Sequence, residues 1–290
     1  MKWVLPQINF IEVLRTMSVA YTAVLDVSED SVLFLSALLH AERVRRGTRK
    51  GTRALGTYNQ AVLVLRWFLD DTRMSALARD NGIAVSTAYD YRDEGVAVLA
   101  ACRPTLRGAL LAAKVAGHSH VIVDGTLIHT DRISTPGPTA GVDLWWSGKH
   151  RHHGGNVQVV SAPDGWPLWT SDVRPGREHD MSAARADPDV LARIADWVSD
   201  GALALADLGY EGEPETFRIL FKKPKAGSLS VDQQSYNAVH GALRCLGERA
   251  NSLLKTTYKA LRRYRGCPWR IGDIVAAALV LLHHEHQRTT

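Results

Sequence analysis

The chain has 290 residues, 46% of them hydrophobic, and a formal net charge of +5. This length allows one large domain or two smaller ones. The three cysteines form no Cys-x-x-Cys pair, which disfavours a zinc knuckle or a disulfide framework and favours a reducing compartment. Pro6 interrupts the amino-terminal apolar stretch, and the apolar run Ile274 to Leu282 is too short to span a bilayer, so we expect neither export nor a membrane role.

Positive charge is concentrated in two stretches. Glu42 to Arg53 contains six Arg or Lys residues and one acid, and Arg249 to Arg270 contains seven and none. Both are typical of surfaces that face a polyanion, although solvated helix faces give the same pattern.

The first third of the chain is expected to be helical. Ser28 to Arg46 combines a polar start with apolar residues at helical spacing. The glycine-rich stretch that follows is either a flexible linker or a phosphate-binding loop. Its candidate phosphate ligands are Arg49, Lys50 and Arg53.

A helix-turn-helix is indicated downstream of a second helix, Tyr58 to Asp70. Residues 73–92 combine a short helix, a turn at Gly82 and a second helix that we expect Ser86 to cap. Acids on that second helix oppose DNA contact, so ordinary helical packing is the alternative. The side chains expected to face outward, toward DNA, are Ser86, Thr87, Tyr89 and Arg92.

A domain boundary is predicted after the helical stretch Pro104 to His118, at its Gly-His-Ser connector. We therefore expect a helical domain over residues 1–116 and an α/β domain over residues 117–290.

Two short apolar runs in the second domain each deliver an aspartate. In the stretch His120 to His129 an apolar run ends on Asp124, directly before a glycine, and the run from Ala202 ends on Asp207. Buried parallel strands appear as continuous apolar runs, and sites in such sheets form where strand ends meet. Both carboxylates are therefore predicted to share one pocket.

Between these strands we expect a histidine-rich loop followed by a hairpin of strands Asn156 to Val160 and Pro167 to Val173. The loop contains Lys149 and His153, which favour a cationic surface facing the substrate. Zinc is disfavoured because the histidines lack a spaced set of partners. Further on, Asp180 is expected to cap a helix from Met181 to Asp200, with a catalytic role as the alternative. Phe217 to Lys223 is expected to form a short strand.

The segment Val239 to Tyr264 has the spacing of an amphipathic helix, with Glu248 as the acid of a basic face. Gly247 is unfavourable in a helix interior by roughly 1 kcal/mol, which indicates a close approach to another backbone. The neighbours of Glu248 on its polar side are Arg244, Asn251 and Lys255. A final apolar helix is expected from Ile271 to His283.

Three carboxylates in a basic molecule favour phosphoryl transfer assisted by two divalent metal ions. Hard ions take oxygen ligands, and a pair of them can activate the attacking oxygen and stabilise the leaving one. Arg244 and Lys255, on either side of Glu248, would then lie along a bound polyanion. Glu211, Glu213 and Glu215 are alternatives for the third acid, although a loop interrupted by Gly and Pro holds a ligand less firmly than a helix.

Five motifs in order carry a family resemblance. They are Asp124-Gly-Thr126, Ser147-Gly-Lys-His-x-x-His-Gly154 with Asn156-Val-Gln158, Pro175-Gly-x-x-His-Asp180, Ala206-Asp-x-Gly-Tyr210, and Arg244-x3-Glu248-x6-Lys255. With them the chain resembles the DDE-type transposases of bacterial insertion sequences, specifically the insertion-sequence-five family and its DDE superfamily endonuclease domain.

The resemblance implies an RNase H-like mixed sheet flanked by helices and preceded by the helix-turn-helix domain. It implies that Asp124, Asp207 and Glu248 hold two Mg²⁺ or Mn²⁺ ions, and that the substrates are the terminal inverted repeats of an element and its double-stranded target DNA. It also implies a homo-oligomer on DNA in a bacterial cytoplasm, associated with the nucleoid. One departure is Gly241, where the related signature has Tyr.

Two other functions stay open. A non-catalytic or domesticated descendant would bind DNA through the amino-terminal helices only, and a hydrolytic RNase H-like nuclease would cleave without strand transfer.

Overall fold

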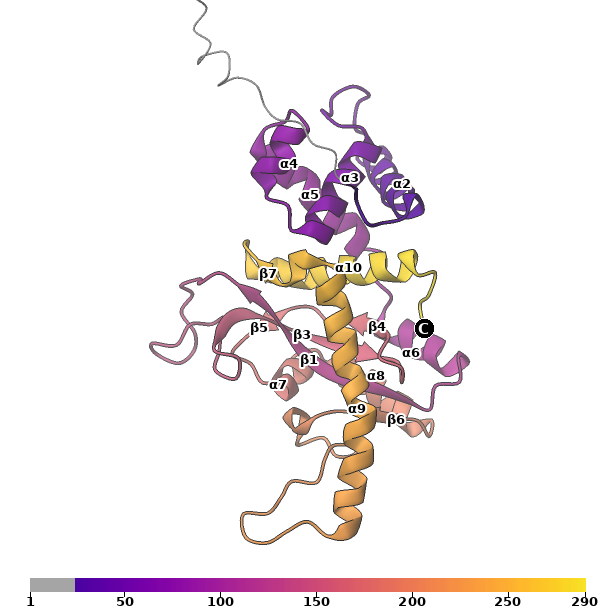
Figure 1. Cartoon of the computed structure of the whole chain (residues 1–290), viewed down its shortest axis with the longest axis vertical. Helices are drawn as coiled ribbons and strands as arrows, with labels where there is room; N and C mark the ends of the chain where they lie inside the picture. The colour runs from indigo at the N-terminus through magenta and orange to yellow at the C-terminus, as the bar shows by residue number, and fades with distance from the viewer. Residues whose placement is uncertain (1–23) are drawn as a thin grey trace, which may run out of the picture.

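The computed structural model describes residues 24–290, so the interpretation of the first residues as a non-exported start lies outside the described residues. A bundle of helices stands at one end, a sheet occupies the middle, and one long helix crosses the sheet and continues beyond it (Figure 1). Among the described helices, none combines the length and the apolar character needed to cross a membrane.

The helices are α2 (Glu29–Arg45), α3 (Thr57–Asp70), α4 (Met74–Asp80), α5 (Val85–Ala100), α6 (Leu106–Val115), α7 (Asp180–Arg185), α8 (Pro188–Ser199), α9 (Val231–Thr257) and α10 (Ile271–Glu285). Short 3₁₀ turns are η1 (Leu208–Tyr210), η2 (Lys259–Leu261) and η3 (Pro268–Arg270). The strands are β1 (His120–Thr130), β2 (Trp146–Ser147), β3 (His152–Ser161), β4 (Pro167–Thr170), β5 (Arg174–Pro175), β6 (Leu203–Leu205) and β7 (Arg263–Tyr264).

Helices α4 and α5 form the hairpin expected for a helix-turn-helix, with two differences. Helix α5 begins at Val85 with Ala84 as its N-cap, so Ser86 does not cap it. Arg92 does not face outward: only 7% of it is exposed, its guanidinium pairs with Asp93, and it lies over the ring of Trp67. The prediction of an outward Arg92 is wrong because a guanidinium can be buried when it is paired and stacked on aromatic rings.

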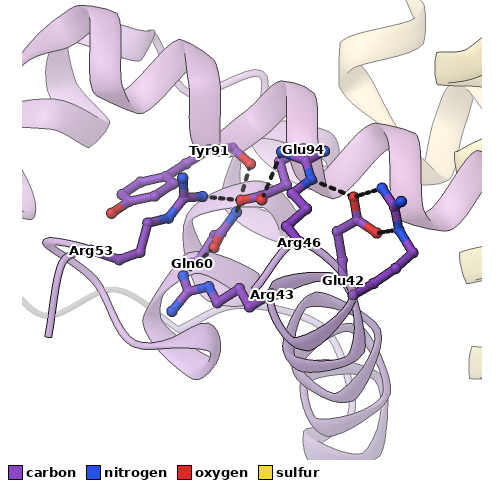
Figure 2. A network of polar contacts seen from close by, with 8 residues as sticks. Glu42, Arg43, Arg46, Arg53, Gln60, Tyr91 and Glu94 are labelled. Atoms are coloured by element: carbon purple, nitrogen blue, oxygen red, sulfur yellow. Dashed lines mark hydrogen bonds and ion pairs between the residues drawn. The ribbon is translucent and has the colours of Figure 1, made fainter. Parts of the chain in front are cut away.

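A buried carboxylate, Glu94, joins the helices of this bundle. It accepts hydrogen bonds from Arg53 and from Gln60 Nε2 and lies 3.5 Å from Arg46 (Figure 2). Arg53 also stacks over the ring of Tyr91. Two cations of the basic Glu42 to Arg53 stretch therefore stabilise the bundle from within.

The sheet is mixed, and its register sets the position of the two predicted acids. β1 runs antiparallel to β3 and parallel to β6, with Ile122 paired to Leu205. Asp124 and Asp207 each follow that pair by two residues, so they lie at the same level. Strand β1 continues past Asp124, and it is the partner β6 that ends, which leaves Asp124 uncovered on that side.

Three predicted elements differ from the structure. The helix expected over Met181 to Asp200 is two helices, because Asp187 caps α8 immediately before Pro188, and a residue before proline avoids the helical conformation. The expected strand over Phe217 to Lys223 is an irregular segment with a single bridge from Leu205 to Arg218. Helix α9 begins at Val231, eight residues earlier than expected, after a capping box of Ser230 and Gln233, and it ends before Tyr264, which belongs to β7.

Helix α10 lies between the bundle and the sheet (Figure 1). Its His283 ring contacts the backbone carbonyl of Pro167 in β4 through Nε2 at 2.7 Å. Glu285 accepts hydrogen bonds from the backbone and hydroxyl of Ser28 at the start of α2. The bundle is thereby fixed to the sheet.

Candidate active site

Asp207 lines a pocket of about 910 Å³ together with Gly125, Lys149, Asn156 and Asp180. Asp124, directly before Gly125, lies close enough to feel the charges of Asp207 and Asp180. Burial raises the pKa of Asp124 to about 6, and the negative charges of Asp207 and Asp180 add to the effect. The ordinary value of this pKa is 3.8, so the two neighbouring carboxylates are close enough to oppose the ionisation of Asp124.

Asp180 is a third carboxylate in this pocket. It is 8% exposed and stands at the first position of α7, whose N-cap is His179. The prediction that Asp180 is the N-cap is therefore wrong, and its side chain turns into the pocket. Asp180 Oδ1 accepts a hydrogen bond from Asn156 Nδ2 over 2.9 Å, and Oδ2 accepts one from Lys149 Nζ over 3.2 Å.

The absence of a side chain at Gly125 leaves the space that the Asp180 carboxylate occupies. A Cβ at residue 125 would lie 2.1 Å from Asp180 Oδ1, so any side chain there would displace the carboxylate. Gly209 has the same relation to Asp180 Oδ2, at 3.1 Å. The glycines that follow the two predicted acids thus provide the space for the third one.

Lys149 balances part of the negative charge. Its Nζ lies 4.0 Å from Asp207 Oδ2, in addition to its hydrogen bond to Asp180. Burial acts to lower the pKa of Lys149, but the carboxylates of Asp180, Asp207 and Asp124 raise it above its ordinary value. The ammonium is therefore held in its charged form among the three acids.

Helix α9 closes the site over Asp124. Gly247 lets the helix approach β1, since a Cβ there would lie 2.6 Å from Ile122 Cγ2. One turn further, Asn251 Nδ2 donates to Asp124 Oδ2 over 2.8 Å, and Lys255 Nζ donates to the carbonyl of Leu127 over 3.0 Å. The close approach predicted from Gly247 is present, although it meets a side chain rather than a backbone.

Glu248 is not part of the cluster. Its side chain is 63% exposed, and its Oε1 accepts a hydrogen bond from Arg244 Nη2 over 3.2 Å. Arg244 itself lies close enough for its positive charge to oppose the rise of the Asp124 pKa. The structure thus brings Arg244 and Asn251 close to Asp124 and Lys255 to the backbone of β1, and it leaves Glu248 exposed on the same helix.

The remaining predicted site residues lie elsewhere. The His153 ring packs edge-on against Trp146, and its Nε2 lies 3.8 Å from Asp143 Oδ1. His153 does not line the pocket; His150 does, together with Lys149. The candidate DNA-binding residues of the helical bundle do not line this pocket. Arg49, Lys50, Ser86 and Tyr89 are exposed, Thr87 is half-buried, and Arg53 and Arg92 are engaged in the contacts described above.

The donor atoms of the pocket suit a hard divalent cation. Asp124, Asp180 and Asp207 supply carboxylate oxygens, and the buried Oδ1 of Asn251 has no hydrogen-bond partner within residues 24–290. In that same range, no three acidic, histidine or cysteine side chains are arranged closely enough to hold a metal ion as they stand. The types of ligand atom suit such an ion, and the Glu248 side chain would have to reorient to join them.

A profile of the family described as DDE superfamily endonuclease matches residues 123–283, more than half of the chain. The chain belongs to this DDE superfamily endonuclease family. The matched range of the DDE domain runs from β1 to α10 and includes every residue of the pocket named above. Its mixed sheet with flanking helices, preceded by a helical region, is the RNase H-like fold that the sequence predicts.

Solved structures resemble the chain only distantly. The Mos1 transposase paired-end complex with left transposon end is 9% identical over 85% of each chain, with a TM-score of 0.22. A pre-cleavage Mos1 transpososome is 8% identical over 86% of this chain and 85% of that one, also with a TM-score of 0.22. A likeness at this level carries no argument about function. No curated protein matches the sequence.

Proposed function

We propose that this DDE domain cleaves DNA at the ends of a bacterial insertion sequence of the insertion-sequence-five family and joins the freed 3′ ends to target DNA. The observation that carries the proposal is the register of β1 and β6, which sets Asp124 beside Asp207 at the point where α9 brings its amides and cations over the sheet. The family match supports the nuclease class.

In this proposal Asp124, Asp207 and Glu248 hold two Mg²⁺ or Mn²⁺ ions, with Asp180 as an additional acidic group in the same pocket. Bound ions of this kind would activate the attacking oxygen and stabilise the charge on the leaving one. Asn251 orients the Asp124 carboxylate through its 2.8 Å hydrogen bond. Glu248, one turn before Asn251, would complete the ligand set once its exposed side chain leaves Arg244 and turns toward Asp124.

The cations of the pocket position the phosphodiester. Lys149 approaches from the β2–β3 side and Arg244 from α9, so the scissile phosphate would be held between positive charges from two elements. A water oxygen attacks phosphorus, the bond to the 3′ oxygen breaks, and the leaving oxygen takes a proton, which yields a 3′-hydroxyl and a 5′-phosphate. In the second step that 3′-hydroxyl attacks a phosphate of the target strand and displaces its 3′ oxygen.

The test is cleavage of a labelled duplex that carries the end of the encoding element, with Mg²⁺, Mn²⁺ or a chelator. We expect metal-dependent nicking by the wild type, loss of nicking for Asp207→Asn, and wild-type nicking for Asp196→Asn, whose carboxylate is 72% exposed on α8. Tight binding of a verified end without cleavage under any metal would favour the DNA-binding descendant instead. Nicking without joining of a supplied 3′-hydroxyl end would favour the hydrolytic nuclease.

A further inference from the structure

An arm extends from the sheet on the side away from the helical bundle (Figure 1). It consists of the irregular segment 216–230 and the first half of α9, residues 231–243. Its two ends are close to the candidate active site. The backbone of Arg218 pairs with Ala204 and Ala206, directly before Asp207, and α9 leads to Asn251.

Specific contacts hold the segment against the helix. The backbone N–H of Phe221 donates to Asn237 Oδ1 over 2.8 Å, and Asn237 Nδ2 donates to the carbonyl of Phe221 over 2.9 Å. The His240 ring contacts the carbonyl of Arg218 through Nε2 at 2.8 Å, and Gln234 donates to the carbonyl of Leu229 over 2.8 Å. The arm is therefore an ordered structure that presents one surface.

The exposed surface of the arm is cationic and aromatic. Over residues 216–243 the sequence contains four cations, Arg218, Lys222, Lys223 and Lys225, and one acid, Asp232. Phe221 and Tyr236 are 46% and 37% exposed, and their rings meet edge to face at 5.0 Å. Lys222 makes one exposed ion pair with Glu211, over 3.2 Å, and such surface pairs are weak.

We propose that the arm binds the DNA duplex beside the scissile phosphate, with its lysines on the phosphates and its aromatic pair against the sugars and base edges. The partner follows from charge complementarity and from the place of the arm, one end of which pairs with the strand before Asp207 while the other leads to Asn251 at Asp124. Lysine contacts to phosphate dominate non-specific DNA affinity, and aromatic rings are the usual companions of such cations in nucleic-acid grooves. This inference rests on the proposed function.

The length of α9 sets the reach of the arm. Asn237, which holds Phe221, precedes Asn251 by 14 residues, and at 1.5 Å per helical residue that is about 21 Å. A DNA strand advances 3.4 Å per nucleotide, so the lysines would meet phosphates roughly six base pairs from the cut.

The experiment measures binding of the full-length chain to a duplex in chelator, as a function of salt, by fluorescence anisotropy. The arm variant is Lys222→Ala/Lys223→Ala/Lys225→Ala. The matched control removes three cations from α6 and α8, Arg107→Ala/Lys114→Ala/Arg193→Ala. Each phosphate that a lysine no longer neutralises reduces the steepness of log K against log salt by about 0.9. We expect a reduction of about 2.7 for the arm variant, which corresponds to three phosphates, and an unchanged slope for the control.

A hydroxyl-radical footprint locates the binding surface on the duplex, and the arm variant should show no protection about six base pairs from the cleavage position, where the wild type protects the strand. An unchanged slope and footprint in the arm variant would overturn the proposal. A second result would also overturn it: Val239→Ser changes the oligomeric state while the lysine substitutions leave DNA binding unchanged. The exposed apolar side of α9 would then bind a second copy of the chain. DNA binding in this assay needs no metal. If the wild type never cleaves DNA but the arm variant still shows the reduced slope, the proposal about the arm stands and only the proposed function fails.

Discussion

Asn251 Nδ2 donates a hydrogen bond of 2.8 Å to Asp124 Oδ2 and so connects α9 to the strand that carries the predicted first acid. The other polar atom of this amide, Oδ1, is buried and has no hydrogen-bond partner in the described part of the chain. A buried acceptor without a donor is unfavourable, and such atoms are concentrated at functional sites. Asn251 therefore both orients Asp124 and leaves one oxygen for a ligand.

We predict that Asn251→Ala lowers divalent metal affinity and cleavage by about 10- to 100-fold, because residues that orient a metal ligand have effects of this size. Isothermal titration with Mn²⁺ and single-turnover cleavage would measure the two losses. The exposed neighbour Ser252→Ala is the control and should retain both activities. Wild-type metal affinity in Asn251→Ala would remove this residue from the site.

Asp124→Asn should stabilise the metal-free protein at neutral pH. The pKa of Asp124 in the folded chain, about 6, is raised above the ordinary value of 3.8, so the ionised carboxylate opposes folding increasingly as pH rises through that interval. The expected gain at pH 7 is on the order of 1–3 kcal/mol. It should fall to a few tenths of a kcal/mol at pH 3.5, where the carboxyl is protonated in the folded state and mostly protonated in the unfolded state. Denaturant unfolding at the two pH values measures it, and an equal effect at both would contradict a charge origin.

Gly125→Ala should destabilise the fold by about 1–3 kcal/mol, because its Cβ would overlap the carboxylate of Asp180. In the double variant with Asp180→Ala this cost should fall, with a coupling of at least ~1 kcal/mol between the two positions. Gly241→Ala is the control, since a Cβ there meets nothing within 4 Å in a helix interior and should stabilise slightly. Strict additivity of the pair would show that Asp180 does not occupy that space.

Removing Glu94 should destabilise the helical bundle. In Glu94→Ala the buried Gln60 amide loses its acceptor and the partly exposed Arg53 guanidinium loses its ion pair, which together cost roughly 1–3 kcal/mol. Asp90→Asn, one turn earlier on the exposed side of α5, should leave the free energy of unfolding unchanged. Urea unfolding of both variants tests this, and similar midpoints would show that Glu94 is not the connection between these helices.

The sequence allowed the prediction of the two strand acids because continuous apolar runs identify buried strands and because parallel strands align their ends. The level of Asp124 beside Asp207 follows from the register of β1 with β6, but the expectation that the strand ends at Asp124 is wrong, because β1 stays paired with β3 as far as His129. The role of Asp180 does not, since its partners Asn156 and Lys149 come from another strand and another loop. The available signal was the glycine after Asp124, which leaves room for a neighbour.

Other differences have local causes that the sequence already contained. Ser230 and Gln233 form a capping box, which could have placed the start of α9 correctly, and Pro188 could have divided the helix after Asp180. The burial of Arg92 could not be predicted in this way, because it depends on Trp67 and Tyr264, aromatic rings from distant parts of the chain. The division of the chain at residues 116 and 117 stays a prediction, and so does the role of Glu248.

Helix α10 also constrains where a cut can fall. Glu285 binds the start of α2, and His283 contacts β4. Through these contacts α10 holds the helical bundle at a fixed distance from the pocket and in a fixed orientation relative to it. A sequence recognised by α5 would then be cleaved at a constant number of base pairs from its centre, on the same face of the double helix each time. Inserting half a helical turn of DNA between recognition sequence and cleavage position would abolish cutting, and a full turn would not restore it.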